Sequence, residues 1–162
     1  EAYDTSGIVT NDRGVTVWLK GNRVSRNQIM AIKEESVTEQ KNSLAVCLDN
    51  ILRHAGITRN TEYDLAQGKT ATTILSENMT GVQVLDLSGC TLDAVLYYVN
   101  QDIPVLAILE DGEAVLVTGF NEFNVVIMEP ATGKLYKKGM NDATAWFAEN
   151  GNHFITYMRT EN

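Results

Sequence analysis

The sequence predicts an α+β domain in which helices precede an antiparallel sheet. Three apolar runs, residues 105–109, 114–118 and 125–128, are rich in β-branched residues. The turns between them, residues 110–112 and 121–124, are short and carry the Gly, Asp and Asn that tight reversals favour. Adjacent antiparallel strands are the arrangement that such short turns allow, so the three runs are expected to form a meander at the centre of the sheet.

The strongest helical pattern begins near Ser43. Its apolar residues recur at intervals of three and four and form one stripe, with Gly56 as a C-terminal stop: Leu44, Cys47, Leu48, Ile51, Leu52 and Ala55. Ser43 stands where an N-cap belongs, and Asn42 is the competing choice. The simplest role for either side chain is to accept hydrogen bonds from free backbone N–H groups.

Shorter elements connect this helix to the meander. Residues 62–67 and 70–78 are predicted to form short helices, and residues 82–87 alternate like a half-buried strand. Thr91 is expected to cap a further helix that runs to Val99 and leads directly into the sheet.

Three elements are predicted after the meander. Residues 134–137 are expected to form an edge strand guarded by lysines, residues 141–149 a helix and residues 153–158 a final strand. Helices therefore come first and the antiparallel sheet follows.

The N-terminal part has a different character. Residues 15–19 predict a short strand, and residues 25–32 a brief helix with Ile29 and Met30 turned inward. We divide the chain into a lead-in, residues 1–30, and one domain, residues 31–162. A length of 162 residues with 44% hydrophobic content suits a single buried core.

Composition excludes two classes of partner. Thirteen Lys and Arg against twenty-one Asp and Glu give a net charge of −8, which repels nucleic-acid backbones and anionic lipid surfaces. The sequence also has no run near the roughly 20 apolar residues that span a bilayer. We therefore expect neither nucleic-acid binding nor direct membrane insertion.

Five segments of the sequence match the motifs of one known family, in the order that the family has them. They are residues 51–57, residues 92–98 leading into 104–107, and residues 112–120, 128–133 and 151–157. Together they resemble the bacterial C39-like branch of the papain-like cysteine peptidases, over residues 40–158. The resemblance implies a papain-like fold, with N-terminal helices packed on a central antiparallel sheet. Residues 14–29 look like a lead-in attached to such domains in larger surface proteins of Gram-positive anaerobes, which implies an extracellular or cell-surface location.

In that family, a Cys opens the central helix, a His on a neighbouring strand takes its proton, and an Asp or Asn on the next strand orients the His. The resemblance places these three positions at Ser43, Glu113 and Glu129. A Ser hydroxyl is a far weaker nucleophile than a thiolate, and a carboxylate that titrates near pH 4.3 is a poor base. The resemblance thus implies a catalytically inactive relative that binds a peptide or protein in a vestigial cleft and needs no cofactor.

Two cysteines offer rival nucleophiles. Cys47 lies on the apolar stripe one turn inside the helix, where a thiol is expected to pack in the core and to be inert. Cys90 precedes the Thr91 cap, and with His153 or His54 it would make a different active site. A disulfide between Cys47 and Cys90 stays open, because its formation depends on their separation in space.

The carboxylates and the two histidines are also candidate groups for hydrolysis or for metal binding. Ser43 with Glu113 and Glu129 would make an acid-based hydrolase triad, so an active hydrolase that uses Cys90 or Ser43 is the alternative function. His54 is expected to interact with the last carbonyls of its helix, and His153 to be exposed or hydrogen-bonded at a turn. With two His and no spaced ligand set, the sequence predicts no zinc site.

Overall fold

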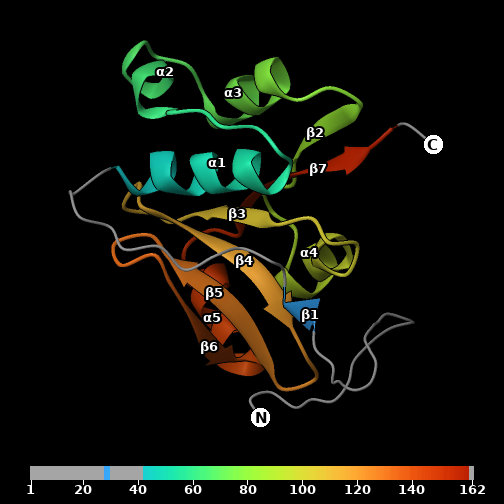
Figure 1. Ribbon diagram of the computed structural model, residues 1–162. Helices are drawn as coiled ribbons and strands as arrows, with labels where there is room; N and C mark the ends of the chain where they lie inside the picture. Colours follow the sequence, from blue (N-terminus) through green and yellow to red (C-terminus); the bar gives the residue numbers. More distant parts are fainter. Residues whose placement is uncertain (1–27, 30–41, 161–162) are drawn as a thin grey trace.

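The computed structural model describes residues 28–29 and 42–160 and shows one antiparallel sheet with helices on both faces (Figure 1). Six strands follow one another across the sheet in the order β2 (Val82–Asp86), β7 (His153–Arg159), β3 (Val105–Ile108), β4 (Ala114–Phe120), β5 (Asn124–Glu129) and β6 (Lys134–Gly139). A two-residue strand, β1 (Gln28–Ile29), pairs with β4 outside this order. The prediction of an α+β fold with an antiparallel meander is confirmed.

The helices form two groups. On one face lie α1 (Ser43–His54), α2 (Glu62–Ala66) and α3 (Ala71–Asn78), and on the other lie α4 (Leu92–Val99) and α5 (Met140–Glu149). All five were predicted from the sequence to within two residues at either end. Thr91 caps α4 by accepting a hydrogen bond from the Ala94 N–H, as expected.

The central strands contribute side chains to two separate hydrophobic clusters, one on each face of the sheet. β4 is buried at all seven positions, and its alternate side chains go to opposite faces. Val115 and Val117 join the cluster under α4 and α5, whereas Ala114 and Leu116 join the cluster under α1 and α3. A strand buried on both faces has no polar alternation, which is why this part of the sequence is continuously apolar.

A bulge in β4 changes this alternation near the end of the strand. The pairing with β5 shifts by one residue between Val117 and Gly119, so that Thr118 is the extra residue. Phe120 consequently lies in the same cluster as Val117, although the two are three positions apart, an odd spacing that would otherwise place them on opposite faces.

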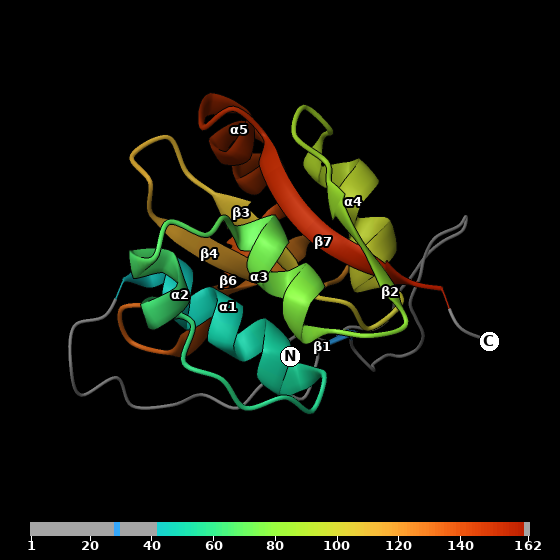
Figure 2. The same ribbon diagram turned by 90° about the horizontal axis from the view of Figure 1, so that it is seen from above.

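The final strand lies inside the sheet, next to the edge strand β2. β7 pairs with β2 on one side and with β3 on the other, as Figure 2 shows. Its register runs from Val82 opposite Arg159 to Asp86 opposite Ile155. The sequence predicts the strand itself but gives no signal for its two partners.

The prediction of a helix over residues 25–32 is wrong at Gln28 and Ile29, which form β1 opposite Phe120 and Gly119. β3 covers the β4 edge only as far as Val117, and the unpaired backbone groups beyond it are satisfied by β1. The strand predicted at residues 15–19 lies outside the described residues. The division at residue 30 stays a prediction.

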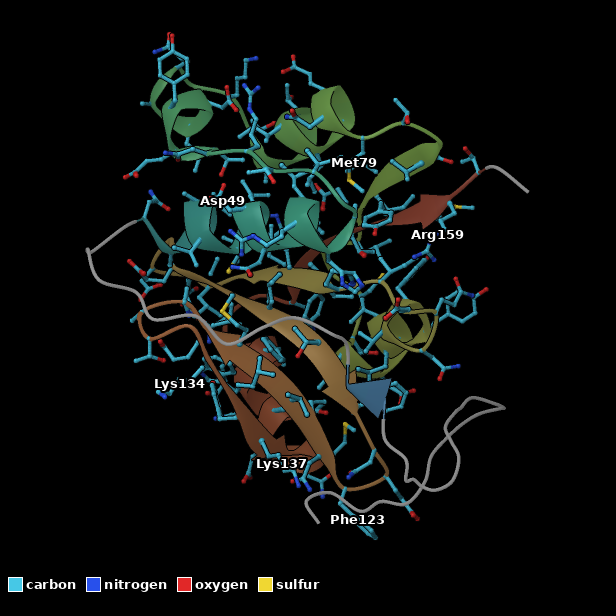
Figure 3. The ribbon with its side chains drawn as sticks, viewed as in Figure 1. Asp49, Met79, Phe123, Lys134, Lys137 and Arg159 are labelled. Atoms are coloured by element: carbon cyan, nitrogen blue, oxygen red, sulfur yellow. The ribbon has the colours of Figure 1, made fainter. Side chains whose placement is uncertain are left out.

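A buried polar network joins the chain before α2 to α1. The Asp49 Oδ1 atom accepts hydrogen bonds from the Thr61 N–H and the Thr61 hydroxyl, both at 2.8 Å. Asp49 and Thr61 are buried, and Asp49 lies on the side of α1 that faces α2 (Figure 3). Next to them, Arg59 binds both carboxylate oxygens of Asp64 at 2.9 and 3.0 Å. These contacts fix α2 beside the first half of α1.

Among the residues that the structure describes, no helix has the length and apolar character that crossing a membrane requires.

Candidate functional site

The start of α1 lies against the start of β4. Asn42 is the N-cap, because its Oδ1 atom accepts from the N–H groups of Leu44 at 2.8 Å and Ala45 at 3.3 Å. Ser43 is therefore the first helical residue, and its hydroxyl is available for another partner. The Ser43 Oγ atom accepts the Ala114 N–H at 2.9 Å. Ala114 directly follows Glu113, so the structure brings these two predicted site positions to neighbouring places.

Glu113 serves the turn between β3 and β4. Its N–H donates to Asp111 Oδ1 at 2.9 Å, its carbonyl accepts from the Leu109 N–H at 2.7 Å, and its side chain is exposed. Within residues 28–29 and 42–160, no hydrogen bond joins the Ser43 hydroxyl to the Glu113 carboxylate. Ser43 and Glu113 therefore do not form, in the described residues, the Ser–carboxylate pair that the alternative hydrolase would use.

Glu129 stands at the end of β5, close to the start of β4 because the two strands are antiparallel. Its Oε1 atom accepts the Ala131 N–H at 2.9 Å, which stabilises the turn before β6. Burial raises the pKa of Tyr136 above its ordinary value, and the negative charge of Glu129 raises it further. The half-buried Glu129 carboxylate therefore lies near Tyr136, a neighbour that no sequence pattern indicated.

Cys47 is not a candidate nucleophile. It is fully buried in the cluster under α1 and α3, as the sequence predicts. Burial raises the pKa of the Cys47 thiol far above its ordinary value, and the nearby charge of Glu129 adds to the rise. Cys47 and Cys90 are both free, so the disulfide between them does not form.

The backbone segments that carry Cys90 and His153 are neighbours in space, but the two side chains lie on different faces of the sheet. The Gly89 N–H donates to the Asn152 carbonyl at 2.8 Å, which makes the two residues near neighbours. Cys90 packs against the cluster under α4 and α5, with Phe154 in that same cluster. His153 precedes Phe154 in β7 and so points to the opposite face. In the described part of the chain, no hydrogen bond joins this thiol to an imidazole.

The charge of His153 acts instead on Asp86. Hydrogen bonds from the hydroxyl and the N–H of Ser88 hold the pKa of Asp86 below its ordinary value, and His153 contributes to the same effect. The arrangement does not give Ser88 a base, because its hydroxyl donates to the carboxylate and not to the imidazole.

The role predicted for His54 is wrong. Its Nε2 atom lies 3.2 Å from the Asp102 carbonyl oxygen and 3.5 Å from Asp102 Oδ2, on the turn between α4 and β3. Asp102 itself has a left-handed backbone conformation, with a φ of 67°. The hydrogen bond with Asp102 raises the pKa of His54 above 6.5, although burial and the nearby charge of Arg159 oppose the rise.

This pair predicts a pH dependence of stability. Because the pKa of His54 is higher in the folded state than in the unfolded state, protonation favours folding. The contribution is fully present below the unfolded pKa of about 6.5 and is lost as the pH rises through the folded value. We expect His54→Gln to lower the free energy of unfolding more at about pH 5 than at about pH 8.5, by urea denaturation at both values. An equal loss at both pH values would contradict this.

Ser43 gives a second prediction. Ser43→Ala removes the acceptor of the Ala114 N–H and should lower the free energy of unfolding by about 1 kcal/mol. The amide of Ala114 should also exchange its hydrogen faster, which NMR can measure residue by residue. Ser88→Ala serves as a control, because it removes a different hydroxyl, one that donates to Asp86 in the turn after β2. An unchanged exchange rate at Ala114 would show that the hydroxyl does not hold the strand.

A metal centre has no support in the described residues, because no group of three or more His, Cys, Asp and Glu side chains is placed to hold an ion.

Comparisons with known proteins find similarity among the solved structures. No family model matches the sequence, and no curated protein matches it. A crystal structure of a protein described as a "putative C39-like peptidase" from Bacillus anthracis does match, with a TM-score of 0.67 over 83% of this chain and 98% of that chain. The two chains share a fold. Their sequence identity is 12%, so the match supports the C39-like resemblance at the level of the fold and carries no activity with it.

Proposed function

We propose that this chain is a papain-type domain that no longer hydrolyses peptides and instead binds a peptide or protein ligand. The proposed binding region lies where α1 and β4 begin and β5 ends, and Ser43, Glu113 and Glu129 mark it. The observation that carries the proposal is the contact between the Ser43 hydroxyl and the Ala114 N–H. It gives the nucleophile position of the C39-like fold a structural partner in place of a catalytic base.

The positions of the cysteine thiols and of the His54 imidazole support the absence of peptide hydrolysis. Thiol chemistry requires a thiolate and an imidazole within hydrogen-bond reach of each other. Cys47 is buried in the core, Cys90 packs on the α4 and α5 face, and His54 is held by Asp102. None of these groups is positioned to act on a substrate at the start of α1.

The same region retains groups suited to binding. The Ser43 oxygen accepts from Ala114 and keeps its own proton to donate, for which a ligand carbonyl is a fitting acceptor. Recognition of an extended peptide depends on shape and backbone hydrogen bonds, and neither requires a thiolate. We further propose that the domain is part of a larger exported bacterial protein, in keeping with the resemblance of residues 14–29.

Hydrolysis and labelling test the inactivity. We expect no cleavage of a fluorogenic peptide mixture above the buffer rate, and no modification of the folded chain by a thiol-reactive peptidyl inhibitor at neutral pH. Modification of Cys90 or Cys47 together with loss of a measured activity would overturn the proposal.

The alignment of positions can be tested by a thiol pKa. Ser43→Cys places a single new thiol at the start of α1, and its pKa follows from the pH dependence of its labelling rate. Adding Glu113→His should lower that pKa, because a nearby imidazolium stabilises a thiolate. An unchanged thiol pKa would show that the two positions do not converge.

Binding is tested by NMR with a tryptic digest of casein as the peptide probe. We expect shifts of the amide signals of Ser43 and Ala114, and loss of these shifts in Ser43→Trp, which fills the region. Tyr63→Trp is the matched control, because Tyr63 is exposed on α2. Shifts that survive in Ser43→Trp would place binding elsewhere.

A further inference from the structure

The turn between α5 and β7 contains Asn150 followed by Gly151, and no other Asn of the chain is followed by Gly (Figure 2). Asn150 is the C-cap of α5, and Gly151 has a φ of 90°, a left-handed conformation that glycine adopts readily. Gly151 is exposed, and no described atom beyond its chain neighbours lies within 4 Å of the place that a Cβ atom would take. Water therefore reaches this pair of residues.

An Asn followed by Gly is prone to a reaction with its own backbone. The Gly nitrogen attacks the Cγ atom of the Asn side chain and loses its proton to water, and the side-chain nitrogen leaves as ammonia. A succinimide ring results, and water then opens it at either carbonyl to give aspartate or isoaspartate. Glycine favours this reaction because it has no side chain to obstruct the attack and leaves the backbone free to rotate.

The folded turn holds both polar ends of the Asn150 side chain. The Oδ1 atom accepts the Glu110 N–H at 3.0 Å, and the Nδ2 atom donates to the Trp146 carbonyl at 3.0 Å. Exchanging the two ends of the amide would set N–H against N–H and oxygen against oxygen, so the two contacts fix one orientation. The carboxamide that would react is thereby anchored to the turn between β3 and β4 and to the last turn of α5.

The Gly151 nitrogen is also held away from the Asn150 side chain. Its N–H donates to the Ala148 carbonyl at 3.1 Å, and the Asn152 N–H donates to the Phe147 carbonyl at 2.9 Å. The ψ of Asn150 is 12°, which places the Gly151 nitrogen nearly in line with the Asn150 nitrogen and away from the Cβ atom. Ring closure therefore requires the turn to open, because the side chain must leave its two partners and ψ must rotate.

We propose that Asn150 is a modification site controlled by this turn: the side chain cyclises onto Gly151 when the turn opens, and the folded turn protects it. The product does not restore the turn. An aspartate here has no N–H for the Trp146 carbonyl, and its charge lies at the C-terminal end of α5, where the helix dipole disfavours an anion. Isoaspartate in addition lengthens the backbone. Each reaction thus permanently weakens the contact between α5 and the turn that carries Glu110.

Mass spectrometry of peptides from the full chain measures the reaction, because the side chain exchanges NH2 for OH. At mildly alkaline pH we expect conversion in guanidinium chloride to be at least about tenfold faster than in the folded chain, since the rate follows the population of open turns. Glu110→Pro removes the N–H that holds Asn150 and should speed conversion in the folded chain about two- to tenfold. Pro suits this position, the second of a turn that the Gly112 N–H closes onto the Leu109 carbonyl.

Glu110→Ala is the matched control, because it keeps the N–H and should leave the rate unchanged. Hydrogen exchange of the β4 amides separates opening of the turn from global unfolding, since it should be unchanged in both variants. Asn150→Asp imitates one product, and the Asn152 amide should then exchange its hydrogen faster.

Three results would overturn the control of this site by the turn. They are equal rates at Asn150 in the folded chain and in guanidinium chloride, no conversion in guanidinium chloride, and an effect of Glu110→Ala equal to that of Glu110→Pro. An unchanged exchange rate of the Asn152 amide in Asn150→Asp would overturn the lasting loss of the contact.

Discussion

Phe154→Ala is expected to lower the free energy of unfolding by about 3–5 kcal/mol, the usual cost of removing a fully buried aromatic ring. Phe154 is completely buried in β7, and its ring centre lies 5.3 Å from that of Phe147 on α5. The change would leave a cavity between the central strands and α5. Because single domains have a total stability of about 5–15 kcal/mol, much of the stability would be lost. The free energy of unfolding is measured by urea denaturation, with circular dichroism as the signal.

Met158→Ala is the matched control on the same strand. Met158 is 38% exposed, so its truncation should cost less than about 1 kcal/mol. A similar loss in both variants would show that the burial of the Phe154 ring does not account for the destabilisation.

Asp49→Ala is expected to have the second largest effect, a loss of about 2–4 kcal/mol. Its carboxylate accepts two hydrogen bonds from Thr61, and removing it leaves the buried Thr61 N–H without this acceptor. Losing hydrogen bonds to a charged group costs about 1.5–3 kcal/mol, and the unsatisfied donor adds to this. Hydrogen exchange should locate the loosening in residues 59–66, where α2 detaches from α1 first.

Asp49→Asn is the appropriate comparison, because its amide oxygen still accepts from Thr61. It should cost clearly less than Asp49→Ala. A cycle with Thr61→Val separates the contribution of the hydroxyl from that of the N–H. If Asp49→Asn and Asp49→Ala destabilise equally, the hydrogen bonds to Thr61 do not account for the burial of Asp49.

The elements that the sequence predicted correctly are those with local signals. The stripe of α1, the cap at Thr91 and the short turns of the meander each lie within a few residues of the element they specify. Local signals also narrowed the cap of α1 to two residues. The choice of Asn42 over Ser43 depended on β4, because the Ser43 hydroxyl is used by the Ala114 N–H across a long stretch of chain.

The features that the sequence did not predict depend on contacts between distant segments. Nothing near His54 indicates Asp102, and nothing near Glu129 indicates Tyr136. The positions of Cys90 and His153 required the register of β7, which sets the face that each side chain takes. Ser43, Glu113 and Glu129 were assigned by resemblance, and their role in binding stays a prediction.

The position of β7 has a consequence for how the molecule is made. β2 pairs with β7, so residues 82–86 have no strand partner until residues 155–159 have left the ribosome. The meander is local in sequence and can assemble during synthesis, while β2 still lacks its partner strand. Pairings between such distant segments are slow to form, and an exposed strand in the meantime invites aggregation. Chains stalled before His153 should therefore be the principal clients of chaperones during biosynthesis.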